Sequence, residues 1–566
     1  MNQYTVGPGK ACLLLLLGQI CTPLYAVASP TPISQAAEID AREQMRQQER
    51  ARAMERQNQP ESEARLARPA IALPDYPAAE RPCFPIKGIA LTGDDGRFQW
   101  ALKAAEDARG RCLGAQGIML ALNKVQNAIL QKGYITTRIM AQEQDLSQGM
   151  LTLTLQPGRI DRILFTQPVS KRARLWNVMP ASPGAILNLR DIEQALENFR
   201  RVPGVEADIS IEPGLQEATS DLKIAWRESR PVHLNIGLDD SGAKSTGKYQ
   251  GSLTLAVNAP FAQNDLFYVS LGRDMFEHGP YASRSRTVNY NIPYGYWLFS
   301  ANYNDYSYQQ NITSANDTLT YSGQSENTQL ALSRLLFRNQ AHKTTFNLRL
   351  WRRHATNAVN GIDIAQQQRR TAGWELGLSQ RSYFGNATTD ASLNWRKGTG
   401  LFNAQPAPEE KSNDGSARTS MFTSDISLNL PIATTSWRYH TSLRGQWSRH
   451  ALTPQDRLAI GGRYTVRGFD GEQMLSGEKG AVWRNELAWN LRPTAHELYW
   501  GVDYGRVGGQ GARYLAGKAL AGSALGVRGA LWQRLSYDLF VSVPLAKPAG
   551  LHTSGVTGGF SFNLQL

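Results

Sequence analysis

The stretch Tyr464-Thr465-Val466-Arg467-Gly468-Phe469-Asp470-Gly471-Glu472 lies inside a long glycine-rich connection, residues 448–479, between two segments that alternate polar and apolar residues. Such segments are typical of strands in an outer-membrane β-barrel. An arginine framed by a glycine and an aromatic residue inside such a barrel calls for an acidic partner in the lumen. The second segment after the connection offers one in Tyr499-Trp500-Gly501-Val502-Asp503-Tyr504.

Period-two alternation extends from residue 231 to the end of the chain, as in Phe346, Leu348 and Leu350, which are separated by Asn347 and Arg349. A polar and an apolar face on strands of about ten residues indicate a membrane barrel, which we place at residues 230–566 with a long sixth loop at 449–479. A soluble β-sandwich could alternate in the same way, but the number of segments and the aromatic strand ends favour the membrane.

We predict sixteen antiparallel strands, an even number, as expected when both ends of the barrel lie on the same side of the membrane. The predicted strands lie near residues 232–240, 248–258, 265–274, 285–293, 296–308, 325–337, 344–354, 372–384, 386–398, 419–431, 436–448, 480–491, 496–507, 519–530, 534–543 and 557–566.

The N-terminus has the pattern of a secretory signal peptide, predicted at residues 1–28. Lys10 is followed by an apolar run and then by Ala26-Val27-Ala28. A lipoprotein anchor at Cys21 is disfavoured because Ile20 is too bulky for such a cleavage site. No later run approaches the ~18 apolar residues that a membrane-spanning helix needs, so helical insertion is not expected.

The net charge of +13 comes from scattered basic residues without a motif that would enter a nucleic-acid groove. For an exported protein we therefore expect anionic lipopolysaccharide, and no nucleic acid, as a partner. The eight histidines are spread out, and the chain has no Gly-x-Ser-x-Gly elbow, zinc-ligand spacing or phosphate-binding loop. We predict no catalytic residues, no metal site and no cofactor.

Residues 29–59 contain one predicted helix, over residues 34–57, which is charged on nearly all sides. Such a helix buries no stripe in an ordinary core. It would be about 35 Å long, which is enough to thread a lumen that spans the bilayer. It is either a plug inside a polar barrel or a solvated tail. A proline-rich linker, residues 60–82, follows it.

Two similar modules of order βααββ are predicted at residues 83–157 and 158–229. In the first, strand 84–91, helices 98–108 and 117–132, and strands 136–141 and 150–156 follow one another. Its second helix places Ile118, Leu122, Val125 and Ile129 on one face.

The second module begins with strand 160–165, followed by helical segments. Of these, helix 188–201 carries Ile192, Leu196 and Phe199 with Asn188 as its cap. Strands 205–211 and 220–226 complete the module. An open strand edge in each module could accept an extended peptide.

Cys83 and Cys112 are the two cysteines that remain after the signal peptide. They lie close together in the first module of an exported protein, where disulfides persist. A disulfide fits better than a metal site, for which two ligands are too few.

The order of these regions resembles the two-partner secretion transporters, the branch of the POTRA-barrel superfamily that exports large exoproteins. The resemblance is sharpest at Val466-Arg467-Gly468-Phe469, which matches the family's loop-six motif, and at Gly501-Val502-Asp503, which matches its inward-facing strand-thirteen motif. The opening Cys83-Phe84-Pro85-Ile86 is similar to the haemolysin-activator and contact-dependent-inhibition subgroup. One departure is Leu566, since barrel assembly signals usually end in an aromatic residue.

The resemblance implies a bacterial outer-membrane protein with two POTRA modules in the periplasm. These modules would capture the N-terminal secretion domain of an exoprotein (a haemolysin, an adhesin or a contact-dependent toxin), and the barrel would pass it outward. The barrel assembly machinery would insert the chain, and we expect a monomer. The alternative is an assembly factor of the same superfamily, although such factors typically carry more POTRA modules and no plug helix.

The alternation of polar and apolar residues predicts the orientation of Asp503, and so its pairing with Arg467, without reference to the family. If Trp500, Val502 and Tyr504 face lipid, Asp503 faces the lumen, where Arg467 could satisfy it with a two-pronged hydrogen bond. Gly468 would let the backbone approach, and Phe469 would pack against the inner wall. Glu486, also inward, is a competing acceptor. Otherwise Arg467 and Asp503 would be solvated, unlinked charges of the lumen.

Overall fold

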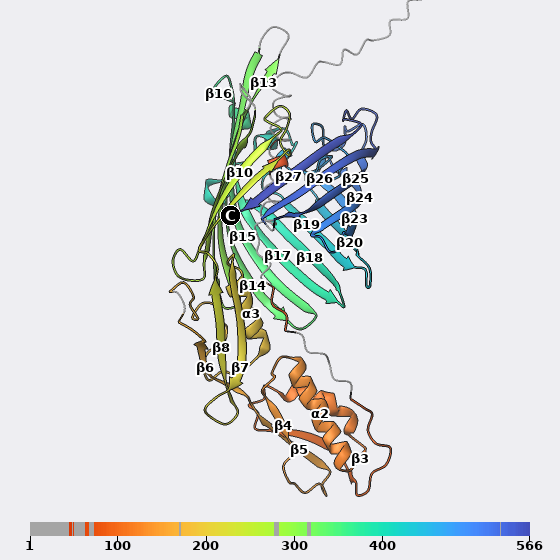
Figure 1. The fold of residues 1–566 in the computed structure, drawn as a ribbon. Coiled ribbons are helices and arrows are strands. Elements are labelled where there is room, and N and C mark those ends of the chain that lie inside the picture. The colour runs from red at the N-terminus through yellow and green to blue at the C-terminus, as the bar shows by residue number, and fades with distance from the viewer. Residues whose placement is uncertain are drawn as a thin grey trace, which may run out of the picture.

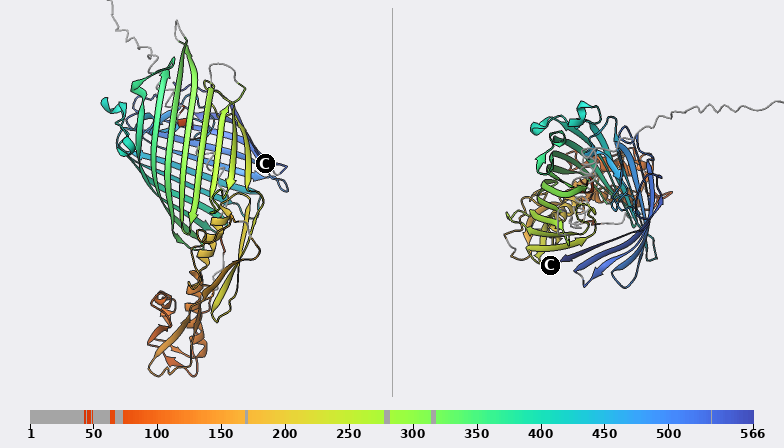
Figure 2. Two further views of the ribbon diagram at one scale, coloured as in Figure 1. Left: turned by 90° about the vertical axis from the view of Figure 1, so that its left-hand side faces the viewer. Right: turned by 90° about the horizontal axis from the view of Figure 1, so that it is seen from above.

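The computed structural model describes residues 43, 45–47, 49, 63–66, 73–168, 171–276, 282–313, 318–532 and 534–566. The predicted signal peptide, most of the predicted helix 34–57 and part of the predicted linker lie outside these residues. Two small modules extend from one end of a large barrel, and chain order runs from the modules into the barrel wall (Figure 1). Figure 2 shows the same arrangement from the side, and its view from above shows the strands arranged around the lumen.

The barrel is a closed antiparallel sheet of sixteen long strands, as predicted, with a short extra strand, β16 (Ile362–Asp363), at the end of β15. The long strands are β9 (Val232–Asp239), β10 (Gln250–Asn258), β11 (Leu266–Asp274), β12 (Ala282–Tyr294), β13 (Trp297–Thr313), β14 (Thr318–Arg338), β15 (His342–Val359), β17 (Arg369–Phe384), β18 (Ala387–Thr399), β19 (Ser420–Pro431), β20 (Trp437–Ser448), β23 (Lys479–Asn490), β24 (His496–Gly508), β25 (Ala519–Leu531), β26 (Leu535–Ala546) and β27 (Thr557–Gln565).

The barrel closes where β27 pairs with β9, with Phe562 opposite Leu238 and Leu564 opposite Ile236. The Leu566 amide also donates to the Leu234 carbonyl oxygen at 2.8 Å. The main difference from the predicted strands is in β14, predicted at 325–337 but extending from Thr318 to Arg338. The added residues, Thr318 to Gln324, are largely polar and pair with the long neighbouring strands β13 and β15, so hydrophobic alternation did not reveal them.

Period-two alternation has the predicted orientation along β24. Leu498, Trp500 and Tyr504 are exposed on the outer surface of the barrel, whereas Tyr499 and Asp503 are buried on the inner one. None of the helices in the described part of the chain is long and apolar enough to cross a membrane.

The first module comprises β1 (Phe84–Pro85), β2 (Gly88–Thr92), η1 (Gln99–Ala108), β3 (Cys112–Leu113), α2 (Ala115–Gln131), β4 (Arg138–Met140) and β5 (Met150–Gln156). The second comprises β6 (Arg159–Phe165), α3 (Leu189–Arg200), β7 (Val205–Pro213) and β8 (Thr219–Glu228). Each contains a three-stranded sheet with the same topology: one parallel and one antiparallel neighbour flank a central strand, β5 or β8.

Several local predictions for the first module were wrong. The first strand is split, because Ile86 and Lys87 bond to the turns at Arg111 and Gly149 instead of continuing the ladder. The first helix is a 3₁₀ helix with a kink at Ala105. The strand predicted at 136–141 shortens to β4, since the Gln126 side chain bonds to Thr137 and Ile139.

The predicted apolar face of α2 is rotated. Val125 and Ile129 are fully buried, but Leu120 is buried in place of the partly exposed Ile118 and Leu122. At the start of this helix, Glu80 lies against the turn that contains Gly114 and Gly117 and accepts hydrogen bonds from both amides.

In the second module α3 is capped as predicted, with the Asn188 Oδ1 accepting from the Arg190 amide at 2.8 Å. Ile192, Leu196 and Phe199 are buried in the core. Of the helical segments predicted after strand 160–165, α3 is the one that forms in the described part of the second module, and residues 171–187 consist of turns and irregular backbone. Pro180 and Pro183 in this segment lack the amide donors that a helix would use.

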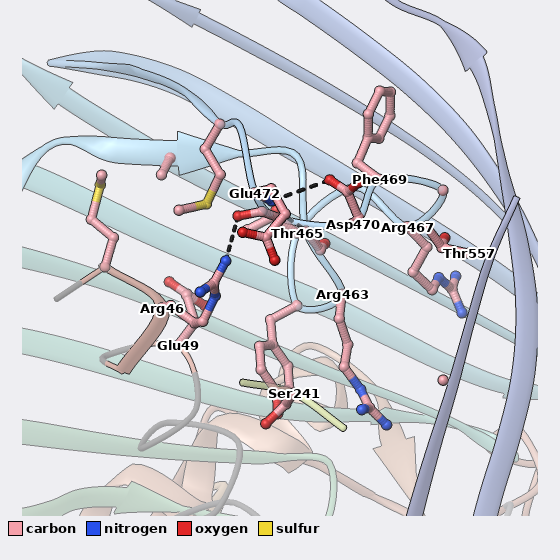
Figure 3. A pocket seen from close by; sticks show the side chains of 18 of the residues that line it. Arg46, Glu49, Ser241, Arg463, Thr465, Arg467, Phe469, Asp470, Glu472 and Thr557 are labelled. Atoms are coloured by element: carbon pink, nitrogen blue, oxygen red, sulfur yellow. Dashed lines mark hydrogen bonds between the residues drawn. The ribbon is translucent and has the colours of Figure 1, made fainter. Parts of the chain in front are cut away.

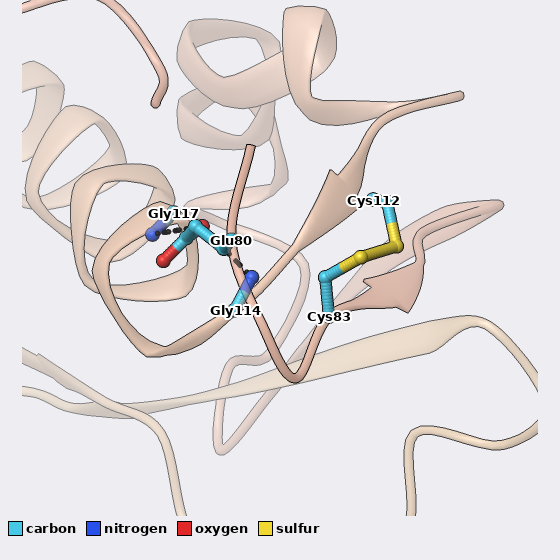
Figure 4. The surroundings of a disulfide bond; sticks show 5 residues. All are labelled: Glu80, Cys83, Cys112, Gly114 and Gly117. Atoms are coloured by element: carbon cyan, nitrogen blue, oxygen red, sulfur yellow. Dashed lines mark hydrogen bonds between the residues drawn. A yellow bond between two sulfur atoms is a disulfide. The ribbon is translucent and has the colours of Figure 1, made fainter. Parts of the chain in front are cut away.

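A disulfide joins Cys83 to Cys112, which flank the small β1–β3 pairing (Figure 4). Next to it, the Glu80 carboxylate accepts hydrogen bonds from the amides of Gly114, Gln116 and Gly117, at 2.8–3.0 Å. These amides lie at the N-terminus of α2, where backbone donors have no partner within the helix and a negative charge is favoured. Disulfide and carboxylate together hold the end of the linker against the first module.

Candidate functional site

The connection between β20 and β23, residues 449–478 and here called loop 6, folds back against the inner barrel wall. Its short strands β21 (Leu458–Ile460) and β22 (Leu475–Gly477) pair with each other. The 3₁₀ helix η5 (Pro454–Asp456) precedes them. Similarly short 3₁₀ helices lie in two other loops: η2 (Ala365–Gln367), η3 (Leu401–Asn403) and η4 (Pro408–Lys411).

An apolar cluster holds loop 6 in place. Val466 and Phe469 pack with Ile460 and with residues of the barrel wall that include Val482 and Leu520. Phe469 is almost completely buried. The loop is therefore a packed layer on the wall.

Arg467 and Asp503 are both buried, with exposed fractions of 5% and 1%. Asp503 Oδ2 accepts from the Arg467 amide at 3.0 Å and from Nε at 2.8 Å, while Oδ1 accepts from Nη2 at 2.9 Å. The side-chain part of this contact is a bidentate pair, which lysine cannot reproduce. Because both groups are buried, removing one would leave the other charge without its main partner.

Glu486 does not compete with Asp503 but supplements it. Its Oε2 accepts from Arg467 Nη1 at 2.9 Å, and its Oε1 accepts from Arg528 Nη2 at 2.5 Å. Arg528 also binds Glu497, which in turn accepts from Arg438 at 2.7 Å. Loop 6 is thus connected through alternating charges to strands β20, β23, β24 and β25.

Glycines on both sides allow this close approach. Gly468 has a positive φ of 103°, and a Cβ there would lie 2.3 Å from the Val543 carbonyl oxygen. On the wall, a Cβ at Gly522 would lie 1.7 Å from the Arg467 carbonyl oxygen, and one at Gly501 would lie 2.2 Å from its Nη2. Gly522 was not singled out from the sequence, although it lies in a run of small residues, 521–524.

The tip of loop 6 also binds two neighbouring outer loops, which the sequence analysis missed. Arg463 Nη1 donates to Asp240 at 2.8 Å in the β9–β10 connection, and Glu472 accepts from the Lys244 amide at 3.0 Å. Asp470 accepts from Ser554 in the β26–β27 connection. Burial alone would raise the pKa of Asp470, but its hydrogen bonds from the Glu472 amide and Ser554 lower that pKa overall.

Five residues of the predicted N-terminal helix are described, and all five are helical. They lie next to loop 6 inside the barrel, where Arg46 and Glu49 line a cavity of about 240 Å³ with Arg463, Arg467 and Asp470 (Figure 3). Met45 packs on Ala459 and Met474 of loop 6.

Polar contacts connect these helical residues to the loop and to the wall. Arg46 Nη2 donates to the Gly471 carbonyl oxygen at 2.5 Å. Tyr306 of β13 donates to Glu43 at 2.6 Å, and Arg444 of β20 donates to Glu49 at 2.6 Å. The charged side chains of these helical residues, which suit neither an apolar core nor a lipid surface, therefore bind polar groups of the inner wall.

A second, larger cavity of about 1040 Å³ lies inside the barrel and has Arg467 in its wall. Arginines from several strands line it, including Arg381, Arg444, Arg484 and Arg528, together with the acidic Asp390 and Glu486. The described wall of this cavity is thus lined by charges of both signs.

The linker residues 63–66 pass through a cluster of charges between the second module and the barrel, here called the mouth clamp. Glu193 and Glu197 of α3 accept from the amides of Leu66 and Ala64. Arg338, in the barrel, donates to the Ala64 carbonyl oxygen at 2.8 Å and pairs with both glutamates. The clamp adds Lys343, 2.6 Å from Glu197, and a Glu63–Arg381 ion pair at 2.5 Å.

This geometry defines a class of protein: an outer-membrane transporter with a POTRA-type periplasmic region and a barrel whose lumen holds a folded loop. Comparison with known proteins agrees. The model of the family described as haemolysin secretion/activation protein ShlB/FhaC/HecB matches residues 218–529. Models of POTRA domains match residues 84–158, in the ShlB-type form, and 159–213.

The outer membrane transporter CdiB-2 of Burkholderia pseudomallei (strain 1026b) is 34% identical over 582 residues, which cover 98% of this chain and 99% of the relative. The solved structure of CdiB from Acinetobacter baumannii superposes with a TM-score of 0.81 at 30% identity, and that of CdiB from Escherichia coli with 0.83 at 26%. Each alignment covers 93% of this chain and 99% of the solved one.

The chain belongs to the ShlB/FhaC/HecB family of haemolysin secretion/activation proteins. It is an outer-membrane transporter of two-partner secretion, as the resemblance of its motifs predicted, rather than a barrel-assembly factor.

Proposed function

We propose that the two POTRA modules recognise the N-terminal secretion domain of a large partner exoprotein in the periplasm and that the barrel passes it to the cell surface. The observation that carries this proposal is that loop 6 and the N-terminal helical residues lie inside the barrel lumen. Loop 6 and the N-terminal helical residues are held to the wall by side-chain contacts such as Arg467–Asp503 and Arg444–Glu49. Their release would open a path without breaking any strand pair of the barrel.

The peptide-binding part of the proposal is supported by the sheet edges of the modules. In each three-stranded sheet the outer strands, β2 and β4 or β6 and β7, have a neighbour on one side within their sheet. An extended chain can add to such an edge through main-chain hydrogen bonds, which suits an unfolded partner.

We assign the helical residues 43, 45–47 and 49 the role of a plug and loop 6 that of a second, wall-bound barrier. Transport would then require both to move. Loop 6 contacts the plug through Arg46 and Met45, so displacement of one element weakens the contacts of the other. We expect no enzymatic chemistry, since the buried charges described above are paired as structural contacts.

We further propose that the exoprotein is a haemolysin, an adhesin or a contact-dependent toxin and that the chain works as a monomer. Insertion by the barrel assembly machinery and contact with lipopolysaccharide belong to the same proposal. The predicted signal peptide, residues 1–28, would direct export, and residues 60–82 would act as the linker between plug and modules.

The test is a secretion assay with the partner exoprotein co-expressed in a host that lacks related transporters. The full chain should release the exoprotein into the medium and bind its N-terminal domain. A chain without residues 84–156 should insert but lose that binding. Undiminished binding would contradict the role of the first module. A fall in unrelated outer-membrane barrels on depletion of the chain would instead favour an assembly factor.

A further inference from the structure

An exposed tryptophan of the second module lies beside the outer surface of the barrel. Trp176 belongs to the turn segment between β6 and α3 and is 60% exposed. Its ring centroid lies 5.8 Å from that of Tyr294, at the end of β12. Trp176 and Tyr294, which is also exposed, thus form a contiguous aromatic patch, and exposed apolar patches mark interaction sites.

Strand register shows which surface Tyr294 belongs to. Tyr294 pairs with Trp297, and Ile292 pairs with Phe299, so all four side chains lie on one face of the sheet. Phe299 is exposed on that face, whereas Tyr306, at an even position of the same strand, faces the lumen and binds Glu43. Tyr294 is therefore on the lipid side.

Further aromatic residues occupy the same end of the barrel on the same face. Phe261 in the β10–β11 turn lies 5.7 Å from Tyr290, which pairs with Ala301 of the outward row. Aromatic residues concentrate where a barrel meets the headgroup region of the membrane. Trp176 extends this belt onto the second module.

The segment that carries Trp176 is firmly attached to the barrel. Asn177, fully buried, donates to the carbonyl oxygens of Gln263 at 2.5 Å and Pro293 at 3.2 Å, and its own carbonyl accepts from Gly295 at 2.8 Å. Asn264 donates to the Arg174 carbonyl oxygen at 2.8 Å. Two periplasmic turns thus hold the segment, and the exposure of Trp176 is a property of a fixed geometry.

Basic side chains accompany the tryptophan. Lys171 and Arg174 are exposed, whereas Arg172 pairs with Glu228. Tryptophan with lysine and arginine is the combination found at the membrane interface, where the ring lies among headgroups and the cations meet phosphate.

We propose that segment 171–176 of the second module is a membrane-contact site for phospholipid of the periplasmic leaflet. Trp176 enters the headgroup region beside Tyr294, and Lys171 and Arg174 bind anionic phosphates. This contact adds a lipid-dependent restraint on the second module to its protein contacts with the barrel, and it is independent of which exoprotein the chain exports.

The test uses the full chain in nanodiscs of phosphatidylethanolamine and phosphatidylglycerol that contain a phospholipid with a diazirine near its headgroup. After irradiation, the tryptic peptide 175–190 should carry lipid adducts, as should peptide 287–334, which contains Tyr294. Peptide 202–223 should not, although its Leu215 is 80% exposed, because Leu215 lies in the β7–β8 turn at the opposite end of the module. Adducts on 287–334 with none on 175–190 would overturn the proposal.

Two sets of variants distinguish the contribution of the Trp176 ring to lipid contact from that of the basic side chains of Lys171 and Arg174. Trp176→Ser should reduce the adduct yield on 175–190 several-fold, and Trp176→Tyr should restore most of it. Lys171→Gln combined with Arg174→Gln should abolish the rise in adduct yield that wild type shows when phosphatidylglycerol is added to phosphatidylethanolamine. For this variant the yield is read on peptide 173–190, because Arg174→Gln removes the tryptic site before Leu175. Heat-modifiable migration of the barrel confirms folding of each variant. Equal yields in wild type and Trp176→Ser would contradict insertion of the ring.

Discussion

The Asp503 carboxylate accepts three hydrogen bonds from a single residue, Arg467: one from its amide and two from its guanidinium group. The backbone and the side chain of loop 6 are therefore fixed by the same acid on β24. This dual contact explains why the motif needs an arginine at this position and a glycine directly after it. The Arg467 amide can reach Asp503 only when the backbone of loop 6 lies directly against the inner barrel wall.

Replacing Arg467 should impair secretion even when positive charge is kept. We expect Arg467→Ala and Arg467→Lys both to insert but to export poorly, with lysine intermediate because it offers a charge without the bidentate geometry. Leaving the buried Asp503 with only the more distant Arg484, at 3.7 Å, should destabilise the loop by up to roughly 3–5 kcal/mol. The measurement is exoprotein in the medium at equal membrane abundance. The control is Arg506→Ala, because Arg506 is an exposed residue of β24, the strand that carries Asp503. Normal export by Arg467→Ala would refute this role.

Gly522→Ala should reproduce the secretion defect with Arg467 intact, because its Cβ would overlap the Arg467 carbonyl oxygen. The loop would have to leave the wall. Gly508→Ala is a matched control, since a Cβ there meets nothing within 4 Å. Loop displacement can be followed by the labelling rate of a cysteine at the buried Val466. If the Gly522→Ala and Gly508→Ala variants show the same labelling rate and the same secretion, close packing of loop 6 against the wall is not required for export.

Weakening the plug contacts should open the pore. Deleting residues 34–57 should raise single-channel conductance in planar bilayers, and Arg46→Ala or Tyr306→Phe should increase the frequency of opening. Tyr306→Phe removes the hydroxyl that donates to the buried Glu43, which costs about 1–3 kcal/mol. Tyr303→Phe, on the lipid side of the same strand, should have no effect. Unchanged conductance after the deletion would favour a solvated tail over a plug.

The mouth clamp should control how readily the linker moves. Ala64 is 3% exposed, so a cysteine at this position should react slowly with a maleimide in the otherwise intact chain. Arg338→Gln should accelerate the reaction, because Arg338 holds the Ala64 carbonyl oxygen and both glutamates of α3. Arg349→Gln, whose partner is Glu375 within the barrel wall, serves as the comparison. Equal rates in the two variants would exclude the clamp as the restraint.

Reduction of the Cys83–Cys112 bond should destabilise the first module while the barrel remains folded. The bond closes a segment with a sequence separation of 29, for which a loss of about 3–4 kcal/mol is expected. Glu80→Gln should have a smaller effect in the same direction, because it keeps some hydrogen bonding at the start of α2 but loses the charge. Urea unfolding followed by proteolysis of the module would measure both. Equal midpoints with and without reductant would show that the bond is dispensable for stability.

Much of the barrel was predictable because its signal is local. In a strand, neighbouring side chains face opposite sides, so the alternation around Leu498, Trp500 and Tyr504 indicates both the strand and the inward direction of Asp503. The helices of the modules were less accurately predicted. The break in the first strand at Ile86 and the turns at 171–187 depend on hydrogen bonds to residues distant in the chain, such as those from Ile86 to Arg111 and from Gly184 to Ile160.

The sequence by itself determined the number and orientation of the strands, the tandem modules and the position of the Arg467 motif, since these follow from short-range periodicity and composition. Only the tertiary structure decided that Glu486 supplements Asp503, that Gly522 faces the Arg467 backbone, that Arg338 clamps the linker and that Trp176 meets Tyr294. These contacts join residues 19 to 274 positions apart. Barrel closure and strand stagger bring them together, and no local pattern of residues encodes either.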